Sequence, residues 1–65
     1  MNGERLRRLR KDRLLTQQEL SRMTGISQDG ISQLENTRRE AQPGTIKKLA
    51  KVLNVEPEEL MKEQG

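Results

Sequence analysis

The 65-residue sequence has no cysteine, no histidine and no aromatic residue. Without cysteine there is neither a disulfide nor a thiolate zinc site, and without histidine the commonest metal ligand and neutral-pH base are missing. Apolar runs never exceed two residues, so neither a membrane span nor a signal-peptide core is predicted. We therefore expect a cytoplasmic protein that needs no metal or cofactor. An enzyme is disfavoured, because the remaining acids and bases are carboxylates and lysines.

Chain length and charge distribution further restrict the classes of function that fit the sequence. A chain of this length forms one small domain at most, here residues 1–65, and such a core supplies only about 3–5 kcal/mol. The net charge is +3, with six basic side chains in residues 4–13 and four acids in residues 56–63. A chain that is basic at one end and acidic at the other favours an oriented approach to a polyanion. A solvated helix surface explains the same charges equally well.

Apolar spacing predicts a first helix over about residues 2–13. Leu6, Leu9 and, just beyond this range, Leu14 lie at near-helical spacing. Thr16, followed three residues later by Glu19, forms a capping box in which each residue satisfies a free amide of the other. A second helix is therefore predicted over residues 17–24, with Leu20 and Met23 facing inward.

A sharp turn should follow. Gly25 can take the left-handed conformation that often ends a helix, and Ser27 is an N-cap candidate for a third helix over residues 28–36. Because only two residues separate the second helix from the next cap, the two helices must cross steeply, as in a helix-turn-helix.

Two further helices complete the predicted fold. Pro43 suits a first helical position, and apolar residues then recur at helical spacing up to Leu53. Asn54 is a plausible C-cap and Val55 a core contact. Glu56 and Pro57 open the last helix, with its next apolar pair, Leu60 and Met61, facing inward. The predicted fold is all-α, a compact five-helix domain.

The predicted helix over residues 28–36 has two unlike faces. At roughly 100° per residue, Ile31 and Leu34 form a narrow apolar face that we expect to dock on the helices at residues 2–13 and 43–53. The opposite arc, about 140° wide by the same spacing, is polar, short-chained and largely uncharged. Its members are Gln28, Asp29, Ser32, Gln33 and Asn36.

This composition suits base recognition in DNA. A Gln or Asn amide both donates and accepts, so it can bond adenine N6 and N7 together, whereas lysine only donates and is drawn to phosphates. Affinity then has to come from basic groups at the edges, here Arg10, Arg38 and Arg39. Toleration of Gln and Ser on an exposed helix is the simpler interpretation of any one of these residues.

The stretch from Leu15 to Asn36 resembles the helix-turn-helix of the lambdoid phage repressors, the Cro proteins and the wider Xre-like bacterial regulators. It reads LTQQELSRMTGISQDGISQLEN. The likeness covers nearly all the chain, since IKKLAKVLNVEPEEL resembles the fourth and fifth helices of that family. The resemblance implies a sequence-specific DNA-binding regulator, most simply a repressor, of bacterial or phage origin. It also implies a homodimer on two half-sites about 34 Å apart, a spacing that the general rule takes from these same relatives.

The resemblance also implies roles for particular residues. Base readout falls to Gln28, Asp29, Ser32 and Gln33, with Gln28 most plausibly on adenine. Contacts to the DNA backbone fall to Gln17, Gln18, Ser27, Asn36, Arg38, Arg39 and Arg10. Gln17 would bond a phosphate through its backbone N–H and side chain, and it could also bond Gln28. Structural roles fall to Thr16, Gly25 and Glu35.

Arg10 and Glu35 match an Arg–Glu pair that is partly buried in some relatives. Two separate solvated charges are the equally acceptable alternative. Asp29 and Gly30 depart from the pattern, since an acid there faces a polyanion and a glycine inside a helix costs about 1 kcal/mol relative to alanine. The operator therefore cannot be copied from a relative.

Another class of function also fits the sequence. A small helical module could use its polar face on a protein, and an antitoxin-like protein would combine such a contact with DNA binding. The acidic stretch at residues 56–63 is the natural candidate for that contact. A steep loss of affinity with salt would favour DNA as the ligand.

Overall fold

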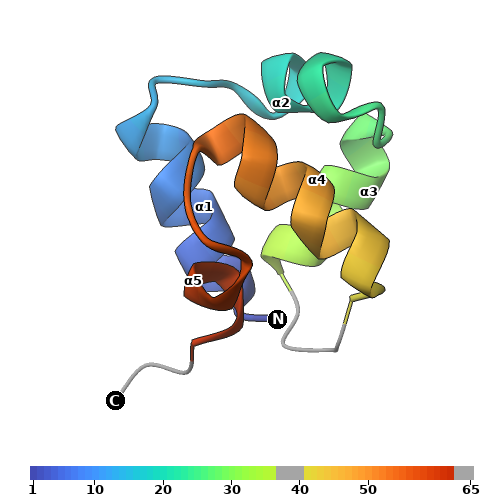
Figure 1. Cartoon of the computed structure of the whole chain (residues 1–65). Coiled ribbons are helices and arrows are strands. Elements are labelled where there is room, and N and C mark those ends of the chain that lie inside the picture. Colours follow the sequence, from blue (N-terminus) through green and yellow to red (C-terminus); the bar gives the residue numbers. More distant parts are fainter. Residues whose placement is uncertain (37–40, 63–65) are drawn as a thin grey trace.

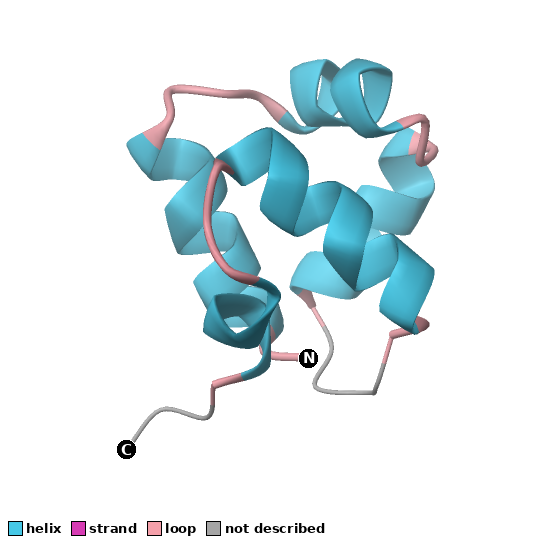
Figure 2. Cartoon of the chain, in the orientation of Figure 1, coloured by secondary structure: helices cyan, strands magenta, loops and turns pink. Residues whose placement is uncertain are grey.

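The computed structural model describes residues 1–36 and 41–62, which form five helices and no strand (Figure 1). The helices are α1 (Gly3–Asp12), α2 (Gln17–Thr24), α3 (Gln28–Glu35), α4 (Pro43–Leu53) and α5 (Pro57–Met61). The predicted all-α class and helix order are confirmed, and short loops join successive helices where the chain is described (Figure 2). In this part of the chain no helix combines the length and apolarity needed to cross a bilayer.

Capping residues set the helix ends. Thr16 Oγ1 accepts from the Glu19 backbone N–H at 3.0 Å, and Glu19 Oε1 accepts from the Thr16 N–H at 2.9 Å, so the predicted capping box is confirmed. The bonds from Thr16, its backbone N–H first, hold the pKa of the Glu19 carboxyl below its ordinary value. Asn54 ends α4 in the left-handed conformation at φ 59°. Asn2 and Asn36 are caps rather than helical residues, which shortens α1 and α3 relative to the prediction.

Every helix contributes to one apolar core. Burial of these side chains is the main favourable contribution to the stability of so short a chain. Six of them are fully buried: Leu6, Leu20, Ile31, Leu49, Leu53 and Leu60. Val55 and Leu15 pack against this core while partly exposed, as predicted for Val55.

Three apolar residues lie outside the core. Met23 and Met61 are each 55% exposed, so the prediction that they face inward is wrong. In α2 the inward position one turn after Leu20 belongs to Thr24, whose hydroxyl can be buried because it donates to the Leu20 carbonyl at 2.8 Å. Leu14, predicted to continue the leucine spacing, is 89% exposed with φ 57° in the loop after α1.

The two ends of the chain pack together, because α1 lies beside α5. Arg5 Nη2 donates to Glu59 Oε1 at 2.7 Å, and Lys62 Nζ donates to Glu59 Oε2 at 3.0 Å. Asn2 is buried at the same junction, where its Nδ2 donates to the Lys62 carbonyl at 3.1 Å. The basic and acidic stretches at opposite ends of the chain are therefore neighbours in space, on α1 and α5.

Candidate nucleic-acid interface

The turn between α2 and α3 is fixed by side chains as well as by glycine. Gly25 has φ 77°, the left-handed conformation predicted for it. Thr24 Oγ1 accepts from the Ile26 N–H at 3.2 Å, and the Ser21 hydroxyl donates to the Ile26 carbonyl. Ser27 Oγ then accepts from the Gly30 N–H at 3.0 Å and caps α3, as predicted. The backbone N–H and the carbonyl of Ile26 are therefore both hydrogen-bonded to side chains of α2, which fixes the turn.

α3 presents its polar face to solvent. Gln28, Asp29 and Gln33 are exposed and Ser32 is half-buried, while Ile31 is buried on the opposite side. Among the described residues, Gln28 and Gln33 have no side-chain hydrogen-bond partner, so both amides are available to a ligand. α3 packs on α1, as expected, and more closely on α2 than on α4, because the short turn holds it beside α2 (Figure 1).

A buried ion pair lies behind this face. Arg10 Nε donates to Glu35 Oε2 at 2.5 Å and Arg10 Nη2 donates to Glu35 Oε1 at 3.1 Å. The side chains of Arg10 and Glu35 are 9% and 3% exposed. Of the two interpretations left open by the sequence, the buried pair is the correct one.

The ion pair also connects α3 to the start of α2. Arg10 Nη1 donates to the Leu15 carbonyl at 2.7 Å, and Gln17 Nε2 donates to Glu35 Oε1 at 3.1 Å. Gln17 therefore bonds Glu35 instead of Gln28, the partner that the resemblance suggested. Nothing in the residue spacing pointed to this bond, because it joins positions at opposite ends of the α2–α3 unit.

Gly3 lets α1 approach the end of α3 closely. A Cβ atom built there would lie 2.4 Å from the Leu34 carbonyl oxygen and 2.6 Å from that of Glu35. No side chain fits at that position without movement of the α3 backbone. The sequence carries a weak signal for this contact, namely a glycine in the first turn of a helix, where it lowers helix propensity.

These features match known proteins. A family model described as Helix-turn-helix matches residues 6–60. The chain belongs to the helix-turn-helix family. The predicted resemblance to helix-turn-helix regulators is confirmed by this family match. It is 47% identical over 64 residues to the HTH-type transcriptional repressor RghR of Bacillus subtilis (strain 168), covering 97% of this chain and 47% of that protein.

A second relative from the same strain, the HTH-type transcriptional regulator RghRB, is 48% identical over 64 residues, covering 97% of this chain and 46% of the relative. The chain thus spans about half the length of these two curated relatives. Solved structures of the same fold include the restriction-modification controller protein C.AhdI from Aeromonas hydrophila, with a TM-score of 0.83 and 36% identity over 89% of this chain and 88% of that one. The N-terminal DNA-binding domain of the biofilm regulator SinR from Bacillus subtilis gives a TM-score of 0.84 and 26% identity over 98% and 94% of the two chains.

The structure places the other residues that were predicted to contact the DNA backbone in different environments. Gln18 is exposed in the first turn of α2, and Asn36 is exposed at the end of α3, where its Nδ2 donates to the Ser32 carbonyl at 2.9 Å. Arg38 and Arg39 lie outside the described residues. The contact of Arg10 with the DNA backbone stays a prediction, since all three of its side-chain nitrogens already donate within the protein.

Proposed function

We propose that this chain is a sequence-specific DNA-binding transcriptional regulator that acts as a repressor and reads the major groove with α3. The observation that carries the proposal is the exposed pair of unpartnered amides, Gln28 and Gln33, on a helix held outward by a fixed turn. The family membership and the relatives named as transcriptional regulators support it. Its place of action is then the compartment that holds the DNA, the cytoplasm of a bacterium, and no catalytic step is required.

The two helices of the unit have different roles: α3 contacts the bases and α2 contacts the DNA backbone. Gln28 bonds adenine N6 and N7 bidentately, and Asp29 accepts from cytosine N4 while Gln33 and Ser32 meet neighbouring base edges. The first turn of α2 binds a phosphate through the free backbone N–H groups of Gln17 and Gln18, where the helix dipole also favours an anion. Ser27, Asn36 and the two arginines at 38 and 39 complete the backbone contacts, which fix the register of α3 in the groove.

Selection of bound sequences from random duplexes tests the proposal. A two-fold symmetric consensus supports a dimer that reads two half-sites. Binding of the consensus by Gln28→Ala should then weaken by about 1–3 kcal/mol, the usual cost of a lost bidentate base contact, with binding to random DNA unchanged. Gln42→Ala is a matched control, because Gln42 is an exposed amide that makes no cap bond at the start of α4. An equal loss on both DNAs contradicts base readout.

The partner in that dimer is a second copy bound through the junction of α4 and α5. An apolar hollow of about 350 Å³ lies there, lined by Met1, Ala41, Pro43, Ile46, Lys47, Pro57 and Met61. Its lysine comes from α4, whereas the first turn of α5 carries the exposed acid Glu58. A two-fold axis across the hollow would bring the base of each copy toward the acid of the other, so the surface is complementary to itself.

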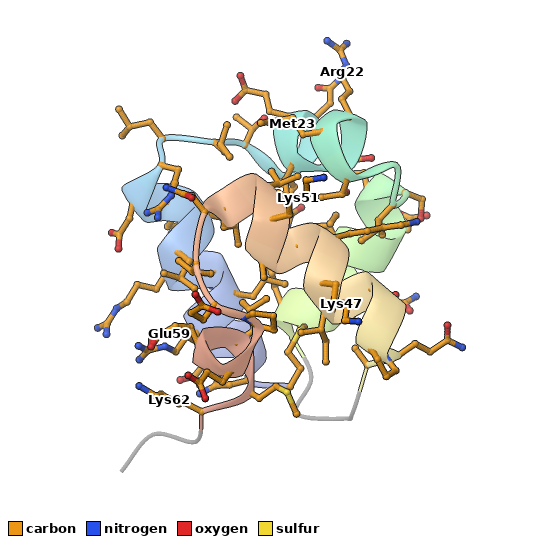
Figure 3. All side chains as sticks on the ribbon, viewed as in Figure 1. Arg22, Met23, Lys47, Lys51, Glu59 and Lys62 are labelled. Atoms are coloured by element: carbon orange, nitrogen blue, oxygen red, sulfur yellow. The ribbon has the colours of Figure 1, made fainter. Side chains whose placement is uncertain are left out.

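A protein-interaction role is the second candidate, and the basic face of α4 favours it. Lys47, Lys48 and Lys51 are exposed, and among the described residues none of them has an ion-pair partner. Lys47 and Lys51 both project from α4 on the near face of the molecule (Figure 3). This role predicts indifference to DNA even at low salt, whereas the DNA-binding role predicts an affinity that falls steeply as salt rises.

A further inference from the structure

Gln17 has its side chain turned into the protein in this structure. Its Nε2 donates to Glu35 Oε1 at 3.1 Å, and Glu35 is only 5% exposed. Gln17 is the first residue of α2, and Glu35 is the last residue of α3. The bond therefore joins the two ends of the α2–α3 unit that lie farthest along the chain from the turn.

The acceptor is rigidly held. Arg10 fixes both carboxylate oxygens of Glu35 from α1, and its Nη1 also holds the Leu15 carbonyl just before α2. Gly3 lets α1 lie directly against the carbonyls of Leu34 and Glu35 at the end of α3. An amide hydrogen bond to such a carboxylate is stronger than one between neutral groups. The start of α2 is thereby tied to a fixed point on α3.

We propose that Gln17 is a positioning residue whose side chain acts on DNA binding through Glu35 and not through a phosphate. The inference rests on the proposed function, because the start of α2 is the part that would bind a phosphate while α3 reads bases. Both contacts can form together only if the two helices keep a fixed relative placement. The Gln17–Glu35 bond sets that placement at the end away from the turn, and the backbone N–H groups of α2 remain free for the phosphate.

The first test compares Gln17→Ala with the unchanged chain on selected and random duplexes. Loss of the tether should weaken binding to the selected site about 10-fold, the effect of one hydrogen bond to a charged group, and change binding to random DNA much less. A purely structural role would lower the folded fraction and leave the ratio of the two affinities unchanged. Gln42→Ala controls for removal of a glutamine amide at a helix start, because Gln42 makes no side-chain cap bond. If the unchanged chain prefers no sequence, the proposed function fails, and this inference fails with it.

The second test determines whether the Gln17 side chain acts through Glu35 or through a DNA phosphate. In an Arg10→Met/Glu35→Leu background the acceptor is absent, and replacing a buried ion pair by apolar residues is often neutral for stability. Adding Gln17→Ala there should cause no further loss of affinity. A repeated 10-fold loss in that background, on the order of the first, would show that the side chain bonds DNA directly and overturn the inference while leaving the proposed function standing.

Discussion

Gly3 shows how a single residue sets the distance between two helices. The Cβ of any other residue there would lie 2.4 Å from the Leu34 carbonyl oxygen, which is backbone and cannot turn away. Gly44, in the first turn of α4, has no such neighbour within 4 Å. The same residue type therefore serves close packing in one helix and costs helix propensity in the other.

Gly3→Ala should lower the free energy of unfolding by about 1–3 kcal/mol, the usual cost of overpacking. Gly44→Ala should leave it unchanged or raise it by up to about 1 kcal/mol, because alanine favours a helix more than glycine does. Urea unfolding followed by circular dichroism measures both. Equal effects of the two substitutions would mean that α1 does not approach α3 as closely as described.

Leu14 has an unfavourable backbone conformation, and its exposed side chain contributes no stabilisation from burial to offset it. Its φ of 57° is in the left-handed region and its side chain is 89% exposed. Left-handed backbone costs a leucine roughly 1–2 kcal/mol, and glycine avoids this but loses about 0.5–1 kcal/mol of chain entropy. Leu14→Gly should therefore stabilise the chain by about 0.5–1 kcal/mol. Leu14→Ala, which keeps a Cβ, should give no comparable gain in the midpoint of thermal unfolding.

Predicting single residues from the sequence succeeded where the reason was local. The Thr16 capping box, the Gly25 turn and the Ser27 cap each depend on neighbours within a few residues, and all were correct. Met23 and Met61 were misplaced, because a helix of 8 or 5 residues gives too short a pattern to decide which of two adjacent positions faces inward.

At the level of the elements, α5 is attached to α1 by a polar junction. Glu59 accepts from both Arg5 and Lys62, and Figure 3 shows Glu59 and Lys62 together at this end of the molecule. These bonds, that from Arg5 first, hold the pKa of the Glu59 carboxyl below its ordinary value. Because the folded pKa is lowered, the carboxylate stabilises the fold above its unfolded pKa, and that contribution is lost as the pH falls through the folded pKa.

Glu59→Gln should accordingly reduce the unfolding temperature at neutral pH and lose this effect as the solution becomes acidic. Thermal unfolding of both proteins from neutral pH to below the ordinary carboxyl value of 4.5 measures the difference. Glu56→Gln is the matched control, because Glu56 is exposed at the start of the same helix, makes no side-chain cap bond and has no ion pair among the described residues. A difference between Glu59→Gln and the unchanged chain that does not vary with pH would contradict the junction.

The order and bounds of the helices could be predicted from capping residues and apolar periodicity. The packing partners of each helix could not. α2 and α4 begin and end as predicted, since Thr16, Gly25, Pro43 and Asn54 mark their ends. That α3 packs on α2 more than on α4 depends on how the chain turns in space, and the pairing of Arg5 with Glu59 spans 54 positions. The exposed polar face of α3 was predictable from one helix, whereas the Arg10–Glu35–Gln17 network required three segments to meet.

The described part of the molecule measures 29 × 20 × 19 Å, so the proposed reading of two half-sites about 34 Å apart requires a second copy. Polar α3 faces solvent on one side, and the apolar hollow at α4 and α5 is the surface proposed for that copy. Both exposed methionines sit outside the core, but Met61 lines the hollow and Met23 does not.

Met61→Glu should therefore weaken self-association at least about 10-fold, because it replaces apolar contact area by a charge that must be desolvated between the copies. Met23→Glu, equally exposed at 55%, should leave it unchanged. Sedimentation measures the monomer–dimer equilibrium, and titration of single and paired half-sites measures its effect on DNA. Met61→Glu should bind one half-site normally and lose the added affinity of the pair. Equal behaviour of the two variants would place the contact between copies elsewhere on the molecule.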